Sequence, residues 1–128
     1  MYNSAMKNAR LITMIGSIVL FGSALFHASG YIPLLRRIQT AAIPSPLDGI
    51  LKASWLTFSI QFLAMAVITF LARNMERGGW IVLLCAAFLA VDAIILLHFL
   101  GPFVGVYLLT VVTLLFLIGG WLQVKQKA

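Results

Sequence analysis

Four long apolar runs constrain this chain more than any other feature of its sequence. They cover about residues 11–29, 50–72, 79–100 and 103–122. A helix needs roughly 20 apolar residues to cross the hydrocarbon core of a bilayer. Backbone in lipid must satisfy its own hydrogen bonds, and no run shows the strict alternation of a barrel strand. We therefore predict an all-α integral membrane protein, with four transmembrane helices in an up-down bundle and a single domain over residues 1–128.

The composition agrees with this assignment and excludes most alternatives. Of the 128 residues, 62% are hydrophobic and 9% are charged, whereas a soluble domain is about half apolar and a quarter charged. The net charge is +6, but the basic residues stand at the ends of the apolar runs, where anionic lipid headgroups attract them. Cys85 is the only cysteine, which excludes an internal disulfide and a thiolate metal cluster. We expect the lipid bilayer, and no nucleic acid, as a partner.

The links between the runs differ in length and composition. The first has some twenty residues and three prolines, and its apolar part predicts a short interfacial helix at about residues 34–40. The second, residues 73–78, is short and charged. The third is Gly101-Pro102, which predicts a tight turn. We therefore expect a longer loop between the first two helices and short connections elsewhere.

The basic residues predict the orientation of the helices. With the N-terminus inside, the inner segments hold six basic residues and the outer segments three, and an excess of Lys and Arg marks the cytoplasmic side. The inner ones are Lys7, Arg10, Arg73, Arg77, Lys125 and Lys127, and the outer ones are Arg36, Arg37 and Lys52. We expect both termini inside, in a bacterial inner (cytoplasmic) membrane.

The first run contains the segment Gly22-Ser23-Ala24-Leu25-Phe26-His27. With this segment, its length and its four runs, the chain resembles the small bacterial four-span proteins grouped as DoxX-like. The resemblance implies no particular activity and no site residue.

Polar side chains gather in the predicted outer half of the membrane. His27 and His98 lie roughly one helical turn from the outer ends of the first and third runs. Asp92 is the only carboxylate well inside a run, and Gln61 lies at a similar depth. Ionisable groups are costly in lipid and are therefore candidates for function. We predict a polar pocket lined by His27, Trp55, Gln61, Asp92 and His98; the alternative is an ordinary interfacial belt.

The other half of the predicted bundle is plainer. Its main polar residues are Thr13, Ser17 and Thr69. Gly101 and Gly105 form a GxxxG step, which indicates close helix packing and would allow a homo-oligomer.

These patterns favour a non-catalytic protein that binds an apolar or amphipathic ligand, or a partner membrane protein, through the polar pocket. One alternative is a redox protein in which His27 and His98 hold a b-type haem or a metal, although zinc prefers three or four ligands. Another is a small proton-coupled transporter that uses Asp92. That carboxylate has a structural interpretation too, as a partner of Gln61 or of a neighbouring hydroxyl. The chain has no GxSxG, HExxH or glycine-rich phosphate loop, so no enzyme class is predicted.

Overall fold

The computed structural model describes the backbone of residues 2–126 and the side chains of residues 4–126. Lys127, which the orientation prediction counts as inner, lies outside this range. The helices are α1 (Tyr2–Ser29), α2 (Tyr31–Thr40), α3 (Ser45–Ala72), α4 (Gly78–Leu100) and α5 (Val104–Lys125). Four helical stretches are long and apolar enough to cross a membrane: Ser4–Thr40, Ser45–Ala72, Gly78–Leu100 and Val104–Lys125. The prediction of an all-helical chain with four helices of membrane-spanning length is confirmed.

The link between the first two spans is much shorter than predicted. Only Gly30 separates α1 from α2, and its own backbone angles are helical (φ −71°, ψ −7°). Pro33 stands in the first turn of α2, where its missing N–H leaves no helical hydrogen bond unmade. Between α2 and α3 only residues 41–44 lie outside the helices, because α3 also begins with a proline in its first turn. The predicted helix at about residues 34–40 is present as the end of α2, and its place at an interface stays a prediction.

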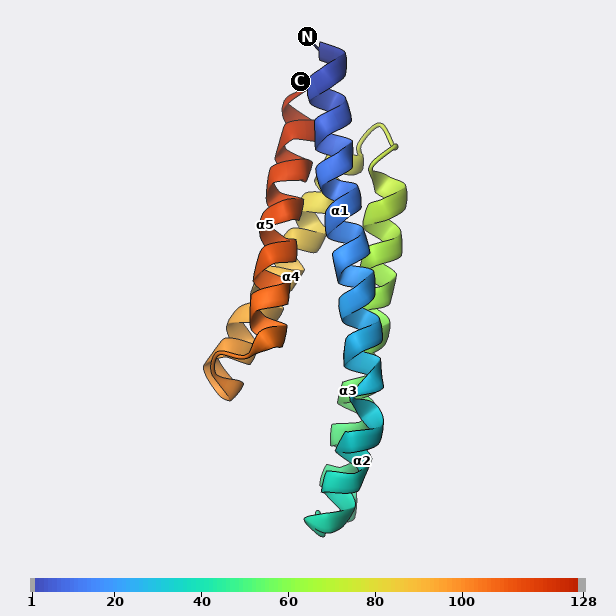
Figure 1. Ribbon diagram of the computed structural model, residues 1–128, viewed down its shortest axis with the longest axis vertical. Helices are drawn as coiled ribbons and strands as arrows, with labels where there is room; N and C mark the ends of the chain where they lie inside the picture. Colours follow the sequence, from blue (N-terminus) through green and yellow to red (C-terminus); the bar gives the residue numbers. More distant parts are fainter. Residues whose placement is uncertain (1, 127–128) are drawn as a thin grey trace.

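The helices pack closely at one end of the molecule and separate toward the other. α1 packs against both α3 and α5, and α4 packs against α5, whereas α3 and α4 touch much less. Both termini lie at the closely packed end (Figure 1), which we call the terminal end. At the opposite end the α4–α5 pair diverges from α1, α2 and α3 (Figure 1), and we call this the divergent end.

Glycines allow the close packing at the terminal end. A Cβ added at Gly79 would lie 2.9 Å from the carbonyl oxygen of Gly120, and one added at Gly120 would lie 3.0 Å from that of Gly79. The backbones of α4 and α5 therefore touch directly, as small residues permit in lipid. Beyond these glycines, a continuous apolar core includes Leu20, Leu89 and Phe116.

The GxxxG step at Gly101 and Gly105 does not serve this purpose. Gly101 lies in the turn between α4 and α5 with φ 75°, and a Cβ added there would meet no atom within 4 Å. A Cβ added at Gly105 would first meet the ring of Phe103, two residues earlier in the chain. Within the chain this step therefore brings no two helices together, because the first glycine shapes a turn; a homo-oligomer stays a prediction.

Burial decreases toward the divergent end. From Ile94 to Leu100 every residue of α4 except Leu96 is exposed, and Phe99 reaches 76% exposure. In α3, the first buried residue is Ser59. The side chains of the two diverging groups of helices therefore do not bury one another there.

Candidate functional site

A compact aromatic and polar cluster joins α1 to α3 near the divergent end. The imidazole Nδ1 of His27 is 2.9 Å from the hydroxyl oxygen of Ser59, and the indole N–H of Trp55 donates to the carbonyl oxygen of His27 at 2.7 Å. The two rings stack, with centroids 4.2 Å apart and planes 18° from parallel. Ser59 also donates to the carbonyl oxygen of Trp55 at 3.1 Å. We call these three residues the His27 cluster.

Neighbouring residues fix this cluster in place. A Cβ added at Gly30 would lie 2.6 Å from Cζ2 of Trp55, so a glycine there lets the indole ring approach the α1–α2 junction. Phe62 meets the imidazole edge-on, with ring centroids 5.9 Å apart. The half-buried His27 ring is therefore held on one face, on one edge and at Nδ1. Its Nε2 has no hydrogen-bond partner among the described residues.

A second polar contact joins α3 to α4. The side-chain amide of Gln61 donates to Oδ2 of Asp92 at 2.7 Å, which is at the short end of the range for N–H···O hydrogen bonds. This is the interaction that the structural interpretation of Asp92 requires. The other carboxylate oxygen, Oδ1, has no hydrogen-bond partner among the described residues and is not fully buried. Asp92 lies roughly 12 Å from the divergent end of α4 by helical rise.

His98 is not part of either contact. It is exposed in the last turn of α4, where its ring meets Phe99 edge-on at 4.8 Å. This end of α4 diverges from α1, the helix of His27 (Figure 1). A haem held by both histidines would require α4 to move toward α1, and this alternative stays a prediction. Within the described part of the chain, no three His, Cys, Asp or Glu side chains come together as a metal site would need.

The most buried polar contacts lie in the half that we predicted to be plain. Gln123 is 3% exposed, and its side-chain amide donates to the hydroxyl of Thr13 at 2.8 Å, across the α1–α5 interface. The hydroxyls of Ser17 and Thr69 are 2.8 Å apart across the α1–α3 interface. Sequence reasoning missed Gln123 because it follows directly after the last apolar run. A glutamine one residue beyond the run, in a helix that continues, was the available signal.

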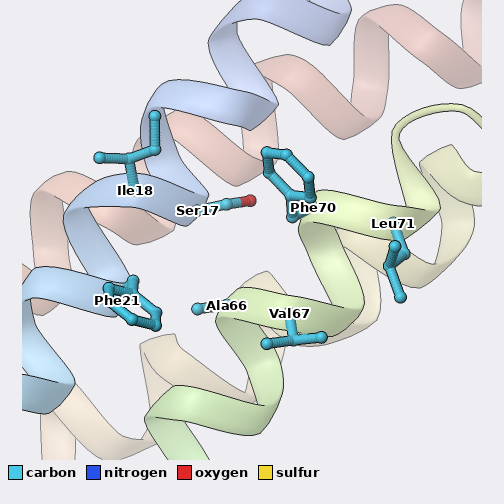
Figure 2. A pocket seen from close by; sticks show the side chains of 7 residues that line it. All are labelled: Ser17, Ile18, Phe21, Ala66, Val67, Phe70 and Leu71. Atoms are coloured by element: carbon cyan, nitrogen blue, oxygen red, sulfur yellow. The ribbon is translucent and has the colours of Figure 1, made fainter.

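Two apolar hollows lie on the surface of the described chain, away from the predicted pocket residues. One, of about 290 Å³, runs between α1 and α3 (Figure 2). Its lining is Ser17, Ile18, Phe21, Ala66, Val67, Phe70 and Leu71. The other, of about 370 Å³, is lined by Leu83, Leu117, Ile118, Trp121 and Leu122 of α4 and α5. Neither includes any of the five predicted pocket residues.

Together these features define a class: an all-helical protein of the membrane type, with four helices of spanning length. Comparison with known proteins adds no narrower identity, since no protein family model, no curated protein and no solved structure matches the chain.

Proposed function

We propose that this protein binds an amphipathic molecule from within the membrane, at its divergent end, and does not transform it chemically. The observation that carries the proposal is the Gln61–Asp92 contact, which leaves one carboxylate oxygen without a hydrogen bond in the middle of a spanning helix. An ionisable group is costly in lipid unless it is paired. A hydroxyl group on a ligand would supply the missing donor.

The surroundings of Asp92 suit the rest of such a molecule. From Ile94 to Leu100, α4 offers a mostly exposed apolar surface that an alkyl chain can cover. The His27 cluster joins α1 to α3 between Gln61 and the divergent end, since Trp55 is roughly 9 Å from Gln61 by helical rise. Its free imidazole nitrogen is a second polar group in the same half of the molecule. The ligand would therefore have one hydrogen-bonding group and a hydrocarbon chain.

We further infer that the terminal end faces the cytoplasm, in a bacterial inner membrane. The support is the charge distribution. Five described basic residues belong to the terminal end: Lys7, Arg10, Arg73, Arg77 and Lys125. An excess of Lys and Arg on one side of the membrane over the other marks the cytoplasmic side. In this orientation the carboxylate of Asp92 is approached from the outer leaflet.

The test uses two probes that differ by one donor. The full chain is placed in nanodiscs that contain equal mole fractions of dodecan-1-ol or its methyl ether, and native mass spectrometry measures the bound fraction. A hydrogen bond to a charged group contributes about 1.5–3 kcal/mol, so we expect the alcohol to bind at least tenfold more tightly than the ether. The Asp92→Leu variant should remove this difference.

A control variant distinguishes the loss of the Asp92 carboxylate from the loss of any polar side chain in the same half of the molecule. Thr110 lies in the same half on α5, and its hydroxyl donates to the carbonyl oxygen of Val106 at 2.8 Å within its own helix. Thr110→Val should therefore leave the preference for the alcohol unchanged. Equal binding of both probes to the unaltered protein, or a preference that survives in Asp92→Leu, would show that Asp92 does not receive the ligand.

A further inference from the structure

The hollow between α1 and α3 is suited to hydrocarbon. Phe21 and Phe70 lie at its two ends, with Ser17 and Ala66 between them (Figure 2). The only polar lining residue is Ser17, and its hydroxyl is already engaged by the carbonyl oxygen of Thr13 at 2.9 Å and by the hydroxyl of Thr69 at 2.8 Å. Its volume of about 290 Å³ is at the lower edge of ligand pockets, roughly 300–1,000 Å³. It therefore fits part of one alkyl chain.

A basic side chain with an unmet hydrogen bond stands beside this hollow. Arg73 follows the last residue of α3, and its guanidinium carbon lies 3.7 Å from the centroid of the Phe70 ring. Its Nη1 atom is buried and has no hydrogen-bond partner among the described residues. A buried donor without an acceptor is costly, and the planar guanidinium group matches the oxygens of a phosphate. The apolar hollow thus has an anion-binding group at one end.

The charge around Arg73 favours the same kind of ligand. Arg10 is exposed on α1, roughly 10 Å by helical rise from Ser17 and toward the terminal end. Arg77 is exposed in the link after α3, which also contains the acidic Glu76. Basic residues at the end of spanning helices attract the acidic lipids of the facing leaflet.

We propose that this hollow binds one acyl chain of an acidic phospholipid whose phosphate group accepts hydrogen bonds from Arg73. The site is separate from the one proposed at Asp92, because it lies between α1 and α3 and shares no residue with it. In a phospholipid the acyl chain and the phosphate belong to one molecule. In the protein, Phe70 both lines the hollow and contacts the guanidinium group of Arg73. A phospholipid therefore satisfies both features at once.

Native mass spectrometry tests this proposal on the full chain, ejected from nanodiscs of four parts phosphatidylcholine to one part phosphatidylglycerol. We expect retained phosphatidylglycerol to exceed its share of the bilayer. Arg73→Gln should lower its retention at least tenfold, as expected for a lost charge-assisted hydrogen bond. Arg73→Lys keeps the charge and should lower it less. Arg77→Gln removes only a surface charge and should cost at most about fivefold.

A second pair of variants tests the position of the chain. Val67 lines the hollow and is 48% exposed, whereas Val111 is 50% exposed on α5 outside it. Val67→Trp should fill the hollow and lower retention at least fivefold, while Val111→Trp should not change it. Circular dichroism verifies that each variant is folded. Equal losses in Arg73→Gln and Arg77→Gln would overturn the proposal. So would retention of the two lipids in the same four-to-one proportion as in the bilayer, or full retention in Val67→Trp. Asp92→Leu should leave lipid retention unchanged, so the two proposals can fail independently.

Discussion

The contact between Gly119 and Thr13 predicts a large cost for adding a single methyl group. A Cβ at Gly119 would lie 2.5 Å from the hydroxyl oxygen of Thr13, 3.2 Å from the Thr13 amide nitrogen and 3.3 Å from the carbonyl oxygen of Ala9. To restore an ordinary contact of at least 3.4 Å, the hydroxyl must retreat by about 0.9 Å, and the two backbone atoms must move as well. In Gly119→Ala, α1 and α5 are therefore forced apart.

The size of the effect follows from two costs and one gain. Overpacking costs typically 1–3 kcal/mol, and displacement of the Thr13 hydroxyl weakens its hydrogen bond with Gln123, which contributes about 1 kcal/mol. Replacement of a helical glycine by alanine returns about 1 kcal/mol. We therefore expect Gly119→Ala to lower the free energy of unfolding by about 1–3 kcal/mol.

Gly22→Ala is the matched control, because a Cβ there would meet no atom within 4 Å. It should keep the gain in helix propensity and leave the protein as stable as before, or up to about 1 kcal/mol more stable. Reversible unfolding in mixed micelles, followed by circular dichroism, measures both variants. If Gly119→Ala were as stable as Gly22→Ala, the close approach of α1 to α5 would not exist in the folded protein.

Two further predictions concern single contacts, and a third concerns the haem alternative. In a protein whose only tryptophan is Trp55, Gly30→Ala should displace the indole ring from the imidazole of His27 and shift the fluorescence emission; an unchanged spectrum would contradict the stacking. Ser17→Ala and Thr69→Val should show a coupling energy of about 0.6 kcal/mol in a double-mutant cycle of unfolding, and zero coupling would exclude their shared hydrogen bond. The purified protein should be colourless before and after dithionite. A Soret band that is lost in His98→Ala would instead support the haem alternative.

The four spans could be predicted because lipid restricts the chain so strongly. Only helices satisfy the backbone of a long apolar run, so run length alone located the four spanning stretches. The α1–α2 junction escaped prediction for a local reason. Pro33 stands in a first helical turn, and a proline there has the same appearance in the sequence as one in a loop.

Contacts between helices could be predicted only in part. Gln61 and Asp92 were placed at one depth by counting residues along their helices, and they do meet. His27 and His98 were placed at one depth by the same argument, yet they do not meet, because depth does not say which helices are neighbours. The pairing of Gln123 with Thr13 spans 110 residues and depends on α5 lying against α1, which no local pattern reveals.

The two ends of the molecule are held by different kinds of contact. At the terminal end, Gly79 and Gly120 let the backbones of α4 and α5 touch directly. Steric contact between the two backbones therefore sets the distance between these helices. At the divergent end, the Gln61–Asp92 hydrogen bond links α3 to α4 where they otherwise touch little. Hydrogen bonds between membrane helices average only about 0.6 kcal/mol, close to the thermal energy. We therefore expect the angle between the diverging helices to vary, which would give a membrane ligand access to Asp92.

Distances between pairs of spin labels test this difference between the ends. In a Cys85→Ala background, the pair Ala41→Cys and Phe99→Cys reports on the divergent end, and the pair Asn74→Cys and Lys125→Cys reports on the terminal end. All four labelled positions are exposed. Because only the divergent end depends on one weak hydrogen bond between α3 and α4, its distance distribution should be clearly the broader of the two, and dodecan-1-ol should narrow it if the alcohol binds at Asp92. Distributions of equal width would mean that the divergent helices are as rigidly held as the packed ones.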